Sequence, residues 1–386
     1  MSNTFIYLMN AYFYQEWWAE YSDPSANDKD VLLRFASNEN MEILNSMIIF
    51  EHPATSNLII FLVSIMLSLP AIALDFKNTQ YLAHQGDAVE QYNLGYMYAI
   101  GDGVHRDYIQ ARYWFEKAAS QGKAEAQSYL GVMYHTGEGV NQDYAKAKYW
   151  FEKAASQGDT QAQYNMGYLY HMGEGVQQND IKAVEWYQIA ANKDFTAAQS
   201  NLGAIYYKAG GMLRNYIRAK YWFEKAANKG EAVSQYNLGL IYDQGKGVPQ
   251  NHIKAVEWYQ KAATRGFVNA QTNLGAKYRK GEGVRQDYAK TKYWFEKAAN
   301  KGEAISQFNL GSMYNNGEGV SQDYAKAFEW YQKSAHQGHI NSQFNIGMMY
   351  KNGIGVLRNK VIAKEWFGKA CQSGDQESCN NYRIMN

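Results

Sequence analysis

Residues 159–194 read DTQAQYNMGYLYHMGEGVQQNDIKAVEWYQIAANKD, and this stretch decides the fold of the chain. It predicts two helices: helix A runs roughly from Thr160 to His171, and helix B follows the loop GEGVQQND as IKAVEWYQIAANK. In both helices, small and large side chains recur at the i, i+3, i+4 and i+7 spacing of a single helix face. Small and large residues alternating on two such faces predict helices that pack closely against each other.

The same unit recurs eight times at a constant interval of 36 residues, without an insertion or a deletion. A Trp of helix B keeps this interval, at Trp114, Trp150, Trp186, Trp222, Trp258, Trp294, Trp330 and Trp366. A Tyr and a Gly of helix A keep it too, at Tyr98, Tyr134, Tyr170, Tyr206, Tyr242, Tyr278, Tyr314 and Tyr350, and at Gly95, Gly131, Gly167, Gly203, Gly239, Gly275, Gly311 and Gly347. Such strict repetition is typical of solenoids, in which each helical hairpin buries its apolar faces against its neighbours.

The predicted fold is therefore all-α: a right-handed superhelix of eight 36-residue helix–turn–helix repeats. Half repeats cap both ends, because Tyr81–Gly86 imitates the end of helix B and Asp375–Tyr382 imitates the start of helix A. We expect this solenoid to span residues 74–386. The chain holds 38 basic and 37 acidic residues, so it lacks the basic excess of nucleic-acid-binding proteins and no nucleic-acid partner is expected.

Glycine has two predicted roles in each repeat. Gly167 and its equivalents lie inside helix A, where Gly costs about 1 kcal/mol relative to Ala, so their recurrence indicates a close helix–helix approach. The loop glycines, such as Gly173, permit positive φ and can end helix A in a left-handed cap. An Asp before helix B, such as Asp143, is well placed to cap the start of that helix.

The pattern AxxQxxLGxxYxxGxGVxxDYxxAxxWFxKAA resembles the Sel-one-like (Sel1-like) repeat, a relative of the tetratricopeptide repeat with a longer loop between its helices. The resemblance covers about residues 87–374. It implies the fold, and it implies an adaptor or scaffold function, because members of this family hold unrelated partners. It does not identify the partner.

The two cysteines lie at the C-terminal end of the array. Cys371 stands where the other repeats carry Ala, and Cys379 stands where they carry the helix A Gln. Their spacing resembles that of the bacterial cysteine-rich members of the family, in which such pairs form disulfides. A bond here would require an oxidising compartment, and the alternative is two free buried thiols.

Residues 58–73 read LIIFLVSIMLSLPAIA, a short apolar run followed by a helix breaker and an A-x-A cleavage pattern. One interpretation is a signal peptide in a protein that starts at Met41 or Met47. A second is an uncleaved membrane anchor, and a third is a buried helix, because the apolar run is shorter than a typical membrane span. Residues 1–57 form an N-terminal extension without a recognisable motif. Both export interpretations place the repeats in a bacterial periplasm or outside the cell, with membrane anchoring as the alternative.

Candidate catalytic and metal sites are weak. Ser120 and Lys123 fit the S-x-x-K motif of penicillin-binding enzymes, but they straddle a turn and lack the accompanying motifs. His336 and His339 flank a glycine without a third ligand at metal spacing. We therefore expect no enzyme activity, no metal and no cofactor.

The side of helix A opposite its repeated residues varies from repeat to repeat, which is expected of the ligand-binding concave face of a solenoid. The residues predicted to bind on this helix A face are Tyr92, Tyr96, Val132, His135, Tyr168, His171, Tyr207, Leu240, Asp243, Arg279, Asn315, Met348 and Lys351. Mixed aromatic and polar side chains suit recognition of a protein or peptide.

The favoured function is thus a non-catalytic, exported scaffold that binds protein or peptide partners through the helix A face. The alternative is a cell-wall protein that binds or hydrolyses β-lactams, with Ser120 as its candidate nucleophile, or one that binds glycan or peptidoglycan through exposed rings. The sequence leaves open whether the rings of Tyr92, Tyr164 and Tyr236 are exposed on this face, because they could instead pack against the neighbouring helix A.

Overall fold

The computed structural model describes residues 76–208, 210 and 214–385, and all regular secondary structure in these residues is helical. The chain divides into Met1–Tyr81 and Leu82–Asn386, and the second unit holds the repeats. The predicted extension at residues 1–57 and the predicted signal or anchor at residues 58–73 lie outside the described residues. Within the described part of the chain, no helix combines the length and the apolar character needed to cross a bilayer.

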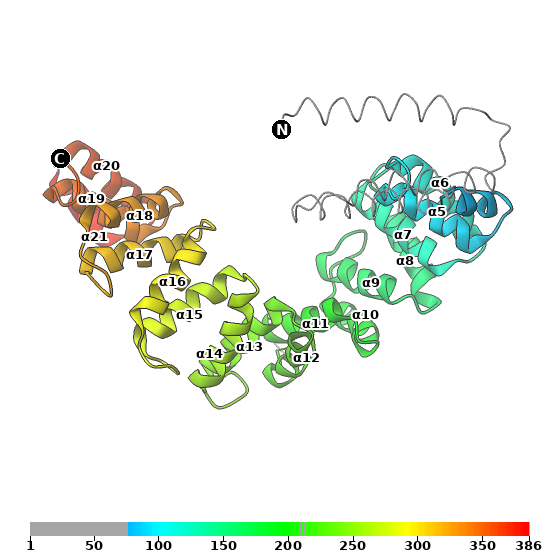
Figure 1. Cartoon of the computed structure of the whole chain (residues 1–386), viewed down its shortest axis with the longest axis horizontal. Coiled ribbons are helices and arrows are strands. Elements are labelled where there is room, and N and C mark those ends of the chain that lie inside the picture. Colours follow the sequence, from blue (N-terminus) through cyan, green and yellow to red (C-terminus); the bar gives the residue numbers. More distant parts are fainter. Residues whose placement is uncertain (1–75, 209, 211–213, 386) are drawn as a thin grey trace, which may run out of the picture. The chain divides into compact units, whose positions relative to one another are not determined.

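Helices A and B alternate along the second unit, and their boundaries match the predicted ones to within one or two residues (Figure 1). The A helices are α5 (Ala88–Ile100), α7 (Ala124–Thr136), α9 (Thr160–Met172), α11 (Thr196–Lys208), α13 (Ala232–Gln244), α15 (Val268–Lys280), α17 (Ala304–Asn316) and α19 (Ile340–Asn352). The B helices are α6 (Tyr108–Ser120), α8 (Tyr144–Ser156), α10 (Asp180–Asn192), α12 (Tyr216–Asn228), α14 (His252–Thr264), α16 (Tyr288–Ala299), α18 (Tyr324–His336) and α20 (Lys360–Gln372). Each helix packs mainly on the helices just before and after it, as in a solenoid of eight repeats.

The predicted caps are present at both ends of the loop that joins helix A to helix B. Gly173 ends α9 in the left-handed conformation, with φ 76°, and its N–H donates to the Leu169 carbonyl at 2.9 Å. Asp143 opens α8 by accepting from the backbone N–H of Lys146 at 3.0 Å. In α10, α12, α14 and α20 an Asn plays the same part. These local signals explain why the helices begin and end where they do.

The helix A glycines lie against a ring of helix B, which confirms the predicted close approach. A Cβ added to Gly167 would lie 2.6 Å from Cδ1 of Tyr187, closer than carbon atoms can pack. The same relationship joins Gly131 to Phe151 and Gly203 to Phe223. The contacting ring belongs to the residue that follows the repeated Trp.

In the structure, the repeated Trp is less deeply buried than the aromatic residue that follows it, although the Trp is the more conspicuous of the two in the sequence. The rings after the Trp are the most deeply buried aromatics, with Tyr187 0% and Phe115 0% exposed. Trp114 and Trp222 are 5% exposed, whereas Trp186 is only half-buried. Trp186 packs against a cluster formed by α8 of the preceding repeat and α9 of its own, so it lies where two repeats meet.

Half repeats cap the array as predicted. At the start, the side chain of Gln91 donates to the Ala83 carbonyl at 3.0 Å, as Gln127 does to Ala119 at 3.2 Å in the next repeat. At the end, α21 (Gln376–Ile384) packs on α20. Residues 82–86 therefore replace the end of a helix B, and α21 replaces a helix A.

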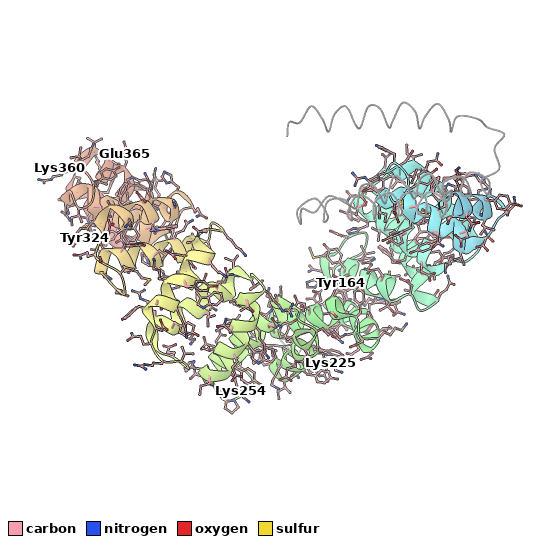
Figure 2. The ribbon with its side chains drawn as sticks, viewed as in Figure 1. Tyr164, Lys225, Lys254, Tyr324, Lys360 and Glu365 are labelled. Atoms are coloured by element: carbon pink, nitrogen blue, oxygen red, sulfur yellow. A yellow bond between two sulfur atoms is a disulfide. The ribbon has the colours of Figure 1, made fainter. Side chains whose placement is uncertain are left out.

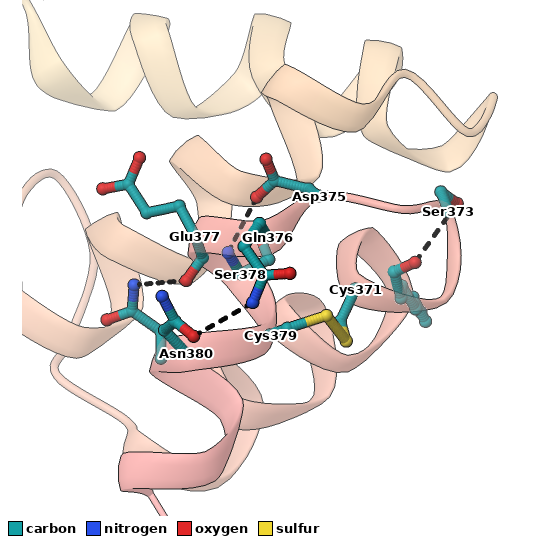
Figure 3. The surroundings of a disulfide bond; sticks show 10 residues. Cys371, Ser373, Asp375, Gln376, Glu377, Ser378, Cys379 and Asn380 are labelled. Carbon is teal, nitrogen blue, oxygen red and sulfur yellow. Dashed lines mark hydrogen bonds between the residues drawn. A yellow bond between two sulfur atoms is a disulfide. The ribbon is translucent and has the colours of Figure 1, made fainter.

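Cys371 of α20 and Cys379 of α21 form a disulfide, with their Cα atoms 4.6 Å apart (Figure 3). The eight earlier helix A segments carry Gln at the position of Cys379, and each Gln donates to the carbonyl of the residue that corresponds to Cys371. Those pairs are Gln91–Ala83, Gln127–Ala119, Gln163–Ala155, Gln199–Ala191, Gln235–Ala227, Gln271–Ala263, Gln307–Ala299 and Gln343–Ala335. A covalent bond thus joins the same two positions in the last half repeat.

Candidate binding surface

The helix A face predicted from the sequence lies on successive A helices, and most of its residues are half-buried. Tyr96 is the most exposed aromatic among them, at 37%. Val132, Leu240 and Met348 are half-buried apolar members, and the first two pack against the core clusters of their repeats. The face is therefore a partly apolar surface whose side chains are held by their surroundings.

The tyrosines near the start of helix A are wedged between two repeats. Tyr164 packs on Tyr187 of its own hairpin at 5.5 Å between ring centroids and on Phe195 before the next helix A at 5.2 Å. Tyr236 packs in the same way on Tyr259 at 5.9 Å and on Phe267 at 5.0 Å. Both rings are half-buried, because each packs between neighbouring repeats.

A cluster of three tyrosines at the start of the array is more open. Tyr92 lies 5.9 Å from Tyr129 and Tyr96 lies 5.6 Å from Tyr129, measured between ring centroids. Burial raises the pKa of the Tyr129 hydroxyl to about 12. The sequence prediction missed Tyr129, although the signal was available. All other repeats carry Asn there, at Asn93, Asn165, Asn201, Asn237, Asn273, Asn309 and Asn345.

The polar residues in the last turn of helix A reach across to the loop of the next repeat. His135 Nε2 lies 2.7 Å from a carboxylate oxygen of Glu174. Arg279 donates from Nε and Nη2 to the two oxygens of Glu318 at 2.8 and 2.9 Å. Each pair joins residues that are 39 positions apart in the sequence, so it ties one repeat to the next and fixes the side chain that a ligand would meet.

Other members of the face also have polar or ring partners. The Tyr207 hydroxyl accepts from Lys246 Nζ at 3.2 Å. His171 Nδ1 lies 2.7 Å from Asp180, Asn315 donates to Asn316 at 2.8 Å, and Lys351 donates to Asn381 at 2.7 Å. The ring of Tyr168 meets the His135 ring edge-on at 5.7 Å.

Asp243 belongs to a charged cluster with a buried lysine that the sequence prediction missed. Lys277 is 6% exposed, and its ammonium donates to Asp243 and to Glu282 at 2.7 Å and lies 3.3 Å from His252 Nδ1. The other repeats carry an aliphatic residue or Met at this position, at Met97, Met133, Leu169, Ile205, Ile241, Met313 and Met349. Ligand atoms of Asp243, His252 and Glu282 lie within 4.8 Å of one another, but the Lys277 ammonium supplies the cation at their centre.

The contacts at the start of helix A alternate from one joint between repeats to the next. Tyr164 and Tyr236 make the ring contacts described above, whereas the intervening joint is polar: Ser200 donates to Glu231 at 3.1 Å and accepts from Ser234 at 3.0 Å. Thr272 likewise donates to Glu303 at 3.2 Å, two repeats further along. The surface therefore has a period of two repeats in this region.

The candidate catalytic and metal residues have structural contacts. The Ser120 hydroxyl donates to the Lys117 carbonyl at 2.7 Å, while Lys123 pairs with Glu125 at 3.1 Å. His339 caps α19, where its ring meets the Phe308 ring in a tilted arrangement at 4.8 Å, and burial lowers its pKa. It is therefore a half-buried capping residue.

Comparison with known proteins relates the chain to a family of repeats. The model of the Sel1 repeat matches residues 91–123, 124–159, 160–195, 196–231, 232–267, 268–303, 304–339 and 340–375. None of the curated proteins compared with the chain matches it.

Two solved structures share the fold over most of the chain. One is c5321, a protective antigen of uropathogenic Escherichia coli strains that displays an SLR fold, with 38% identity and a TM-score of 0.75 over 80% of this chain. The chain spans 66% of the length of c5321. The other is a Sel1 repeat protein from Oxalobacter formigenes, with 30% identity and a TM-score of 0.66 over 80% of this chain and 90% of that one.

Proposed function

The chain belongs to the Sel1 repeat family, and from this we propose that it is a non-catalytic scaffold that binds protein or peptide partners through its helix A face. Sel1 repeat proteins generally mediate protein–protein interactions and typically perform no catalysis. The particular surface and its use in this chain are our proposal.

The proposal rests on one observation: the side chains of this surface are held in place by their neighbours and differ from repeat to repeat. Tyr96, Tyr168 and Leu240 each offer a half-buried apolar surface at equivalent positions of different A helices. The next A helix, α15, adds a charged group, Arg279, whose orientation is set by an ion pair with the following repeat. A peptide that lies along the A helices would meet side chains that lose little conformational freedom on binding, which favours affinity.

Residence outside the cytoplasm is part of the proposal. The Cys371–Cys379 disulfide supports it, because disulfides form and persist in oxidising compartments and are rare in the cytosol. A periplasmic or secreted protein agrees with cleavage after Ala73, and a membrane-anchored protein agrees with retention of residues 58–73. N-terminal sequencing of the mature protein separates these two forms.

The test compares two triple variants in which exposed or half-buried apolar side chains are removed. Tyr96→Ala, Tyr168→Ala and Leu240→Ala alter the helix A face. Tyr113→Ala, Tyr149→Ala and Tyr293→Ala remove rings from the B helices, where they are 47%, 50% and 48% exposed. Each purified chain is cross-linked to an envelope extract, and recovered partners are identified by mass spectrometry.

Loss of a partner with the helix A variant and its retention with the helix B variant would support the proposal. Unchanged recovery with both variants, while circular dichroism shows intact helices, would contradict it. A labelled penicillin provides the test of the alternative: a covalent adduct that disappears in Ser120→Ala would favour a β-lactam-binding protein.

A further inference from the structure

The outward surface of the B helices carries two rows of cations that the proposed function does not use. The third residue of the helix forms the first cation row, and all of its members are exposed: Lys146, Lys182, Arg218, Lys254, Lys290 and Lys326. The tenth residue forms the second cation row, also exposed: Lys117, Lys153, Lys225, Lys261, Lys297, Lys333 and Lys369. Seven residues separate the rows, so both lie on one face of a helix that carries both, about 10 Å apart. In α10 the exposed Ile189 replaces the cation of the second row.

Aromatic rings hold these cations in place. Lys182 lies over the Tyr170 ring at 5.2 Å, Arg218 over Tyr206 at 5.6 Å and Lys254 over Tyr242 at 5.3 Å. In the second cation row, Lys261 lies over the Trp258 ring at 4.0 Å. A ring positions an ammonium or guanidinium group without neutralising it, so the charge stays available to an anion.

The helix caps divide the first cation row into neutralised and free members. Lys146, Lys290 and Lys326 pair with the capping carboxylates of Asp143, Asp287 and Asp323 at 3.5, 3.8 and 3.0 Å. In α10, α12 and α14 the cap is Asn179, Asn215 or Asn251, whose side chain carries no charge. In three consecutive B helices, therefore, no capping carboxylate pairs with the cation of this row.

The surface between the rows limits the kind of anion that fits. Tyr221 of α12 is 51% exposed and presents a ring between Arg218 and Lys225. The equivalent residues on either side are the exposed carboxylates Glu185 and Glu257. Closely spaced phosphates or sulfates would approach these carboxylates, whereas a polymer with one charge per sugar can place neutral parts beside them.

From these observations we propose that α10, α12 and α14 bind a linear polysaccharide whose sugars carry carboxylate groups. Its carboxylates pair with the first cation row on all three helices and with Lys225 and Lys261 of the second, and a sugar ring lies against Tyr221. Figure 2 shows Lys225 and Lys254, one from each row, on neighbouring B helices. The site lies on helix B, so it is independent of the helix A face.

Polygalacturonate is the probe, and two neutralising triple variants of the full chain are compared with the unaltered protein. Lys182→Gln, Arg218→Gln and Lys254→Gln remove the unpaired cations. Lys146→Gln, Lys290→Gln and Lys326→Gln remove the same charge from the same row, at positions where a capping carboxylate already offsets it. Isothermal titration at low and moderate salt gives the affinities, and circular dichroism checks the fold.

The first variant should bind polygalacturonate about tenfold more weakly, because it loses three exposed ion pairs, and the second should change affinity by about twofold or less. An equal loss in both variants would indicate diffuse attraction and would overturn the proposal. So would absence of measurable binding by the unaltered protein at low salt. Heparin and single-stranded DNA are run in parallel, and stronger binding of either one would assign the surface to a different polyanion and also overturn it.

Discussion

Gly167 of α9 lies directly against the ring of Tyr187 in α10, at a distance that leaves no room for a Cβ atom. The same arrangement recurs in every repeat, with Phe or Tyr as the ring. Glycine at this position therefore sets how closely helix A and helix B approach, and the aromatic residue fills the space that glycine leaves.

Replacement of Gly167 by Ala should therefore destabilise the array, although Ala favours a helix. Overpacking costs about 1–3 kcal/mol, and the gain in helix propensity offsets about 1 kcal/mol of it. Gly368→Ala is the matched control, because a Cβ there would lie 3.2 Å from the partly exposed ring of Tyr382 near the chain end. Urea unfolding followed by circular dichroism should show a lower midpoint for Gly167→Ala only. Equal midpoints for the two variants would refute the close-approach argument.

Reduction of the Cys371–Cys379 bond should loosen the end of the array and leave its centre unchanged. On the chain-entropy estimate a loop this short contributes about 2–3 kcal/mol. Hydrogen exchange at the backbone of α20 and α21 should therefore accelerate in reductant. The double variant Cys371→Ala, Cys379→Gln restores the pair found in the other repeats, and its exchange should not respond to reductant. If exchange in the unaltered chain is also insensitive, the bond does not constrain these helices.

Lys277→Met should destabilise the protein even though Met occupies the equivalent position in other repeats. The substitution leaves Asp243 and Glu282 without their shared cation, at a cost of about 1–3 kcal/mol. Further replacement with Asp243→Asn and Glu282→Gln should recover most of this loss, because no unpaired carboxylate remains. Lys280→Met, whose side chain is 65% exposed, should change stability by less than about 0.5 kcal/mol. Chemical denaturation measures all three, and a stable single variant would contradict the cluster's role.

The folded protein should become less stable in acid, because two of its carboxylates have lowered pKa values. A hydrogen bond from Arg279 lowers the pKa of Glu318, and one from Lys277 lowers the pKa of Glu282, both below the usual 4.5. Between the lowered pKa and 4.5 the unfolded chain binds more protons than the folded one. The stabilisation is therefore complete above pH 4.5 and is lost as the pH falls through the lowered pKa.

Denaturation midpoints measured from pH 3 to pH 7 test this dependence. In Arg279→Gln the contribution of Glu318 should disappear, so the acid-dependent part of the curve should become shallower. A curve that is unchanged by this substitution would show that the Arg279–Glu318 pair does not influence stability.

The sequence predicted the repeats, the helix boundaries, the caps and the glycine contacts, because each depends on residues that are close in the chain or recur at a fixed interval. It did not predict the relative depth of Trp186 and Tyr187, which depends on how one hairpin meets the preceding one. The sequence also could not predict the pairing of His135 with Glu174, because these residues meet only when two repeats stack. The sequence could have identified Lys277 and Tyr129, because each departs from the residue type that all other repeats carry at its position.

The alternating joints restrict how such an array changes length. Removal of residues 231–302 would bring Ser200 beside Glu303 and Ser306, the kind of neighbours that it has now. Removal of residues 231–266 alone would set the Ser200 hydroxyl against Phe267 and Ala270, neither of which has a side chain that can accept its hydrogen bond. Repeats in this region can thus be added or deleted in pairs, because the contacts between neighbouring repeats then still match. Adding or deleting an odd number of repeats leaves one interface at which these contacts do not match.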